Sequence, residues 1–101
     1  MPDVLSFITN KKRRFMTKED ITVYATQSCM YCHALVDWLN ENNIPHTLKF
    51  IDADEAAYNE VKTRSGGDIY GVPVTFIKNI KIEGFAREQI AAVLAQNGIT
   101  I

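Results

Sequence analysis

Two cysteines stand three residues apart, at Cys29 and Cys32, in a chain of 101 residues that contains no others. Before them, Ile21-Thr22-Val23-Tyr24 is β-branched and aromatic, which predicts a buried strand. After them the spacing is helical, so the pair stands at a strand-to-helix junction. Unpaired backbone N–H groups and the helix dipole favour a thiolate there, lowering the cysteine pKa to about 3.5–7.5 from about 8.5. We expect Cys29 to attack disulfides as a thiolate and Cys32, one turn later and further inside, to resolve the mixed disulfide.

Metal binding and simple packing are the alternative roles for the two thiols. A structural zinc site takes four ligands at characteristic spacings, and only His33 and His46 could join the pair. A helix projects His33 about 100° away from Cys32, and a second C-x-x-C is missing. We therefore expect no metal. We expect His33 to pack on the surface rather than act as a base.

Gly71-Val72-Pro73-Val74 is the second candidate site feature. A proline at a strand entry donates no N–H, and a cis Val72-Pro73 bond would turn the chain sharply and expose the backbone of Val72. An exposed backbone edge beside a thiol can pair with an extended substrate chain. We predict that this bond is cis and that its backbone faces Cys29, although only about 5–6% of X–Pro bonds are cis. Tyr31, between the cysteines, is a candidate partner contact.

The elements that position these residues follow from periodicity. Leu35, Trp38 and Leu39 recur on one helical face after Ser28, the expected N-cap, and this helix closes at Asn42-Asn43. A second strand is expected at 47–51 and a second helix, capped by Asp52 or Asp54, with Ala57, Tyr58 and Val61 inside. A third strand at 74–77 pairs as a hairpin with 80–83, and Ile90, Val93 and Leu94 mark the last helix. The predicted class is α/β, in the order β-α-β-α-β-β-α, with a mixed four-stranded sheet flanked by helices.

Length and charge narrow the function classes. One domain is expected at this length, and a formal net charge of −1 gives no reason to expect nucleic acid as a partner. The sequence has no apolar run long enough to span a bilayer, and two thiols without a signal peptide favour a reducing compartment, the cytoplasm. Residues 1–19, with the basic run 11–14, are expected to form a flexible extension of a redox domain at 20–101.

With these motifs the sequence resembles the glutaredoxin branch of the thioredoxin superfamily. The similarity runs from about Ile21 to Ala95 and is carried by four stretches: Val23-Tyr24, Cys29-Met30-Tyr31-Cys32, Gly71-Val72-Pro73-Val74 and Glu83-Gly84-Phe85. The resemblance implies a thioredoxin-like fold, a nucleophile at Cys29, a resolving thiol at Cys32 and a cis proline at Pro73 that faces their disulfide. Candidate substrate-binding residues are Tyr31, Val72, Pro73, Gly84 and Phe85.

This sequence departs from the typical glutaredoxin pattern at positions that distinguish subgroups of the family. Typical glutaredoxins have lysine at the position of Thr26, T-V-P in place of Gly71-Val72-Pro73, and G-G-x-D in place of Glu83-Gly84-Phe85-Ala86. The missing lysine and aspartate help to hold the charged ends of glutathione. The G-F-x-x-x-x-I pattern from Gly84 to Ile90 is similar instead to NrdH-type redoxins. Their C-x-Q-C is not matched, because Tyr31 replaces the glutamine, and Ile82-Glu83 replaces their tryptophan-containing stretch.

The resemblance to NrdH-type redoxins implies a reductase of protein disulfides that is re-reduced by thioredoxin reductase and supplies electrons to enzymes such as ribonucleotide reductase. The alternatives are a glutathione-dependent glutaredoxin that acts on mixed disulfides and, less favoured, an iron–sulfur cluster carrier. We expect a monomer with no bound cofactor, whose redox group is the Cys29–Cys32 disulfide. Glutathione is the external reductant in the first alternative.

Overall fold

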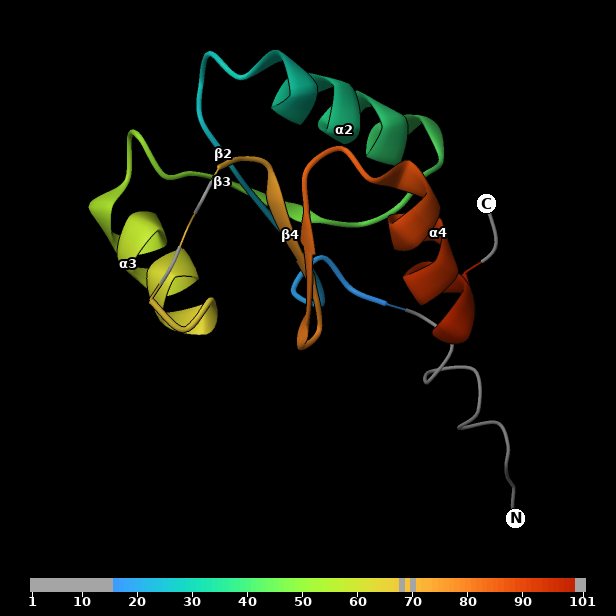
Figure 1. Ribbon diagram of the computed structural model, residues 1–101. Helices are drawn as coiled ribbons and strands as arrows, with labels where there is room; N and C mark the ends of the chain where they lie inside the picture. Colours follow the sequence, from blue (N-terminus) through green and yellow to red (C-terminus); the bar gives the residue numbers. More distant parts are fainter. Residues whose placement is uncertain (1–15, 68, 70, 100–101) are drawn as a thin grey trace.

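The computed structural model describes residues 16–67, 69 and 71–99 (Figure 1). Strands and helices follow one another in the predicted order, and all seven elements are found close to where the sequence predicts them. Their bounds are β2 Ile21–Ala25, α2 Met30–Glu41, β3 Thr47–Phe50, α3 Glu55–Arg64, β4 Val74–Ile77, β5 Ile80–Glu83 and α4 Arg87–Gln96.

The four strands form one mixed sheet in the order β3-β2-β4-β5. Strand β3 lies parallel to β2, whereas β4 runs antiparallel to both β2 and β5. This arrangement confirms the predicted parallel crossover and the late hairpin. Because β2 and β3 are parallel, their carboxyl ends, and the residues that follow them, lie at the same edge of the sheet. The start of the antiparallel β4 lies at this edge too, since Val74 pairs with Tyr24.

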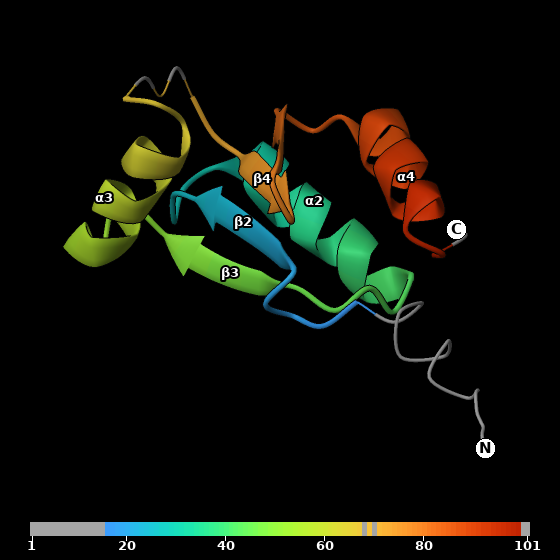
Figure 2. The ribbon, with the colours of Figure 1, turned by 90° about the horizontal axis from the view of Figure 1, so that it is seen from below.

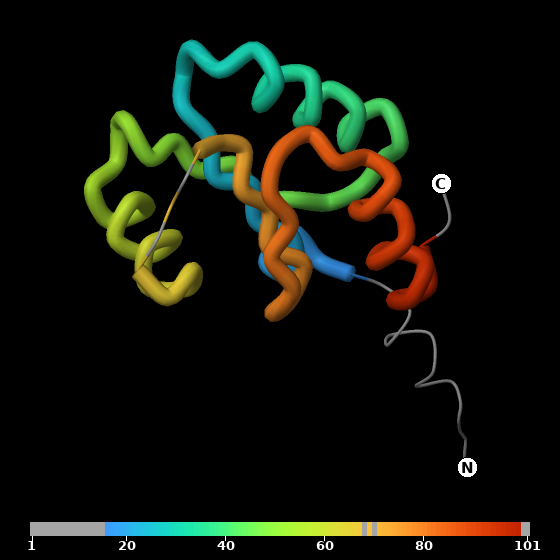
Figure 3. Tube along the Cα trace, viewed as in Figure 1, coloured from blue at the N-terminus to red at the C-terminus, as the bar shows by residue number. Residues whose placement is uncertain are grey.

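The helices cover the sheet in two layers (Figure 2). Helices α2 and α4 lie on one face, where Leu35, Leu39, Ile90 and Leu94 pack into a single core cluster with inward-facing strand residues such as Val23. Helix α3 lies on the other face, as the tube trace also shows (Figure 3). Each fully buried aliphatic side chain contributes about 1.5–3 kcal/mol to folding. The burial of these side chains therefore holds α2, and the cysteines at its N-terminus, firmly against the sheet.

Tyr58 was expected inside the second helix, but its side chain is 41% exposed. It follows Ala57 by one residue, and a helix turns by about 100° per residue, so both cannot point at the sheet. Trp38, expected in the core, is half-buried and packs against it. Strand β3 ends at Phe50 rather than Ile51, because the chain turns where the backbone N–H groups of residues 53 and 54 bond to the Phe50 carbonyl.

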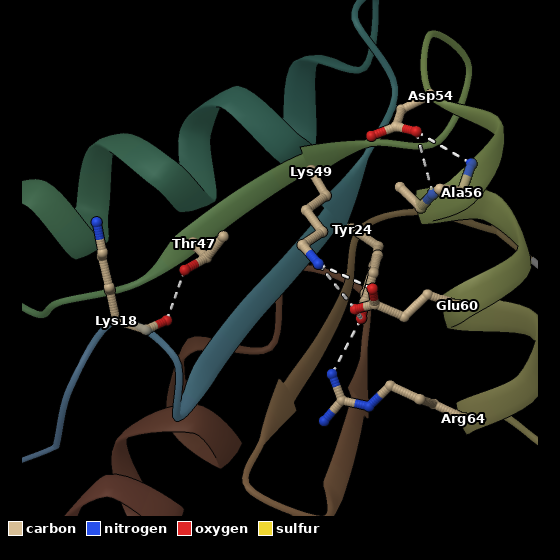
Figure 4. A network of polar contacts seen from close by, with 9 residues as sticks. Lys18, Tyr24, Thr47, Lys49, Asp54, Ala56, Glu60 and Arg64 are labelled. Carbon is tan, nitrogen blue, oxygen red and sulfur yellow. Dashed lines mark hydrogen bonds and ion pairs between the residues drawn. The ribbon is translucent and has the colours of Figure 1, made fainter.

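A polar network attaches α3 to the sheet (Figure 4). The buried hydroxyl of Tyr24 donates to the Glu60 carboxylate, Lys49 Nζ lies 2.8 Å from Glu60 Oε1, and Arg64 donates to the Tyr24 hydroxyl at 3.0 Å. Hydrogen bonds from Lys49, which has the larger effect, and from Tyr24 lower the pKa of Glu60. Burial raises the pKa of Tyr24 to about 12. At the start of α3, Asp54 is the N-cap and accepts from the Ala56 N–H at 3.0 Å.

The expected extension at residues 1–19 lies mostly outside the described residues, but Met16 and Lys18 at its end contact the domain. Met16 is 6% exposed and belongs to the larger core cluster. The carbonyl oxygen of Lys18 accepts from Thr47 Oγ1 at 2.7 Å (Figure 4). The packed unit therefore includes Met16, four residues before the expected boundary at residue 20. No helix among the described residues is long and apolar enough to cross a membrane.

Candidate active site

Cys29 and Cys32 are joined as a disulfide at the N-terminus of α2. The expected N-cap, Ser28, is wrong: Cys29 itself occupies the N-cap, with an extended backbone, and its Sγ accepts from the Cys32 N–H at 3.1 Å. The helix begins one residue later than expected, so the sulfur rather than the serine hydroxyl meets the unpaired N–H group. After reduction the same N–H group would stabilise a thiolate on Cys29. Cys29 is half-buried and Cys32 only 1% exposed.

Two side chains hold the loop that leads into Cys29. The Asp52 carboxylate accepts from the backbone N–H of Gln27, with Oδ2 at 3.1 Å. On the other side, Nε2 of His33 donates to the Gln27 carbonyl oxygen at 2.8 Å. The sequence indicates Asp52 as a possible helix cap and His33 as surface packing rather than a base or a metal ligand, and it does not predict this contact with the loop. The signal for Asp52 was its place just after β3, whose carboxyl end lies beside that of β2.

The Val72-Pro73 bond is cis, as predicted, and it lies beside the cysteines. The carbonyl oxygen of Val72 is 4.0 Å from Cys29 Sγ. Pro73 is buried, and its own carbonyl oxygen accepts from the Gly84 N–H at 2.8 Å. The structure thus brings together Cys29, Cys32, Val72, Pro73 and Gly84.

A groove of about 270 Å³ opens at this place, lined by Gly71, Val72, Glu83 and Gly84. A Cβ added to either glycine would meet nothing within 4 Å, so the groove is open at both of these positions. Tyr31, the candidate partner contact, is 69% exposed. The site therefore combines a reactive sulfur, a backbone edge and an exposed aromatic side chain.

Phe85, a candidate substrate-binding residue, lies outside this groove. It packs partly against the larger core cluster, and the Arg87 guanidinium carbon lies 5.2 Å from the centre of its ring. Both residues line a second hollow of about 250 Å³ at the start of α4. Within residues 16–67, 69 and 71–99, no three His, Cys, Asp or Glu side chains gather in a way that could hold a metal ion.

Comparison with known proteins adds a family and a fold. The family model described as Glutaredoxin matches residues 21–82. A thioredoxin-like protein of known crystal structure has 26% sequence identity to this chain and a TM-score of 0.70, over 76% of this chain and 96% of the other. Glutaredoxin 1 from Francisella tularensis, complexed with cacodylate, is 29% identical, with a TM-score of 0.56, over 76% and 95%. The glutaredoxin-like NrdH-redoxin from Escherichia coli shares the fold at 19% identity and a TM-score of 0.62, over 72% and 92%.

A curated relative matches a shorter stretch. The global transcriptional regulator Spx 1 from Bacillus cereus is 38% identical over 53 residues. That segment makes up 48% of this chain and 40% of the regulator, so the similarity spans less than half of either protein.

Proposed function

The chain belongs to the glutaredoxin family, and we propose that it reduces protein disulfides through Cys29 and Cys32. The family and its Cys-x-x-Cys pair support thiol–disulfide oxidoreductase chemistry at a general level. The observation that carries the finer proposal is the position of Cys29, whose sulfur accepts from the Cys32 N–H and lies 4.0 Å from the Val72 carbonyl oxygen. A nucleophile and a backbone edge for an extended substrate stand side by side.

The reaction uses both sulfurs of the reduced protein. The Cys29 thiolate attacks one sulfur of a substrate disulfide, that S–S bond breaks, and the second substrate sulfur leaves with the electron pair. Cys32 then loses its proton, attacks Cys29 Sγ and releases the first substrate sulfur as a thiol. The substrate gains two electrons and the protein is left as the Cys29–Cys32 disulfide found in the structure.

Thioredoxin reductase is the reductant that we propose to restore the dithiol. Glutathione carries two carboxylates and an ammonium group, and charge-assisted hydrogen bonds to such groups are worth about 1.5–3 kcal/mol each. Thr26 offers no cation and Ala86 no acid, while Glu83 lines the groove and repels a carboxylate. Arg87 is the one nearby residue of the α4 hollow that could meet a carboxylate instead. A protein reductase needs only an accessible disulfide and a complementary surface.

We further propose that the protein acts as a monomer in the cytoplasm, without a bound cofactor. Its physiological substrates would be disulfide-bonded enzymes of the class that the resemblance to NrdH-type redoxins suggests, ribonucleotide reductase among them.

A coupled assay with two arms tests the proposal. One arm holds NADPH with thioredoxin reductase, and the other holds NADPH with glutathione and glutathione reductase. Each arm measures NADPH consumption on a disulfide-bonded protein at the same concentration of this chain. We expect faster turnover with thioredoxin reductase. An equally fast or faster glutathione arm would assign the chain to the glutathione-dependent glutaredoxins, and Arg87→Ala would then show whether Arg87 binds the glutathione carboxylate.

The local match to a global transcriptional regulator favours a second candidate function, transcriptional regulation. Absence of NADPH consumption in both arms, with the Cys29–Cys32 disulfide still reducible by dithiothreitol, would favour it. The iron–sulfur carrier is distinguished by a brown absorbing species after anaerobic purification, which we do not expect.

A further inference from the structure

Among the residues that the structure describes, Glu83 is the one charged residue that lines the groove beside the disulfide. Its partners in the lining are Val72, whose carbonyl oxygen lies beside the reactive sulfur, and two glycines. The Glu83 side chain is 55% exposed. A substrate segment that pairs with the Val72 backbone therefore passes an accessible carboxylate.

Lys81 is the cation paired with Glu83. Its Nζ lies 3.0 Å from Glu83 Oε2, while Lys81 itself does not line the groove. An exposed ion pair of this kind is weak in water and leaves the carboxylate open to a second cation. Arg87 lies over the Phe85 ring and lines the α4 hollow rather than this groove.

A second carboxylate, that of Asp52, lies beside the loop that leads into Cys29. Asp52 is exposed, and it accepts from the backbone N–H of Gln27, two residues before Cys29. Asp52 therefore adds a negative charge next to the loop before Cys29, while Glu83 is the carboxylate that lines the groove.

We propose that the groove selects disulfides in which the reacting cysteine is flanked by lysine or arginine, with Glu83 as the residue that pairs with this cation. This inference rests on the proposed oxidoreductase function and names its substrate class: extended, basic segments of disulfide-bonded proteins. Complementary charge raises the rate of encounter and disfavours acidic partners.

Two peptide probes test this selection. They are identical except that lysine or glutamate flanks a single cysteine, which is held in a mixed disulfide with thionitrobenzoate. The Cys29 thiolate attacks the peptide sulfur, and thionitrobenzoate leaves as the better leaving group, visible by its absorbance. Cys32 then transfers its proton to the departing peptide thiolate and closes the protein disulfide.

With the reduced wild-type protein, we expect the lysine peptide to react about two- to fivefold faster than the glutamate peptide, the range of an exposed ion pair. Glu83→Gln should remove this ratio and Glu83→Lys should invert it, and added salt should weaken it. Glu41→Gln is the matched control, because Glu41 is exposed at the far end of α2 and should keep the wild-type ratio.

The outcomes separate the two proposals. Equal rates for the two peptides, or a ratio that Glu83→Gln leaves unchanged, would overturn the charge selection while leaving the oxidoreductase function standing. Release of thionitrobenzoate from neither peptide, at a concentration where dithiothreitol releases it, would overturn the oxidoreductase function itself.

Discussion

The Sγ atom of Cys29 lies 4.0 Å from the carbonyl oxygen of Val72, a residue 43 positions later in the chain. The antiparallel pairing of β2 with β4 creates this contact, because it places Tyr24 opposite Val74 and so brings the residues just beyond these strand ends together. The nucleophile and the backbone edge are thus held by the same rigid sheet. This relationship makes the roles of the two cysteines directly testable.

Substitution of each cysteine should have a different effect. Cys29→Ser should abolish disulfide reduction, because the thiolate at the N-cap is lost. Cys32→Ser should retain the first attack and accumulate mixed disulfides with protein substrates, which mass spectrometry can detect. Full activity of Cys32→Ser on protein disulfides would show that a monothiol mechanism operates and that Cys32 does not resolve.

Substitution by alanine should destabilise the protein at Gly84 but not at Gly71. Gly84 has a φ of +81°, where an L side chain is strained, whereas a Cβ meets no atom within 4 Å at either position. Gly84→Ala should therefore lower the free energy of unfolding in urea by about 1–2 kcal/mol. Gly71→Ala should leave it unchanged or raise it by up to about 1 kcal/mol. Equal effects of the two substitutions would contradict this explanation.

The contribution of Glu60 to stability should depend on pH. Hydrogen bonds from Lys49 and Tyr24 lower the pKa of Glu60 from its ordinary value of 4.5. A group with a lowered folded-state pKa stabilises the fold above its unfolded pKa, and this stabilisation disappears as pH falls through the folded-state value. Glu60→Gln should cost about 0.5–1 kcal/mol at pH 7, a value limited by solvent screening, and less at about pH 3.

Urea unfolding of the Glu60→Gln variant and the wild type at both pH values measures this difference. Glu41→Gln removes the same charge at an exposed position, and for it we expect no such change between the two pH values. A Glu60→Gln penalty that stays constant from neutral to acidic pH would mean that the carboxylate is not ionised in the network.

Met16 should mark the beginning of the stabilising part of the chain. It is 6% exposed within the larger core cluster, so Met16→Ala should lower the free energy of unfolding by about 2–4 kcal/mol. Lys18→Ala is the control, since its side chain is exposed and only its backbone carbonyl accepts a hydrogen bond.

From the sequence we predict that removal of residues 1–15, with Met16 kept, changes neither folding nor activity. Thermal unfolding of all three variants measures these effects, and a Met16→Ala variant as stable as the wild type would exclude Met16 from the stabilising core.

Local rules in the sequence determined the order of the elements and the candidate thiols. β-Branched composition, turn residues, and period-two and helical spacing together located the seven elements, and the C-x-x-C at a strand–helix junction identified Cys29 and Cys32. The proline at the entry of β4 was sufficient to nominate Pro73. These patterns can be recognised in the sequence because each of them involves residues that are only a few positions apart.

The sequence placed Val72-Pro73 beside Cys29, but only the tertiary structure showed which further residues hold the thiols in place and where the packed domain begins. Asp52 reaches Gln27 because β2 and β3 are parallel, and Met16 is buried because the larger core extends to the chain before β2. The pairing of β4 with β2 places the start of β4 beside Cys29, and the pairing of β4 with β5 places the end of β5 at one groove with Val72. Such contacts join residues tens of positions apart, and their geometry depends on register and helix packing, which no local pattern encodes.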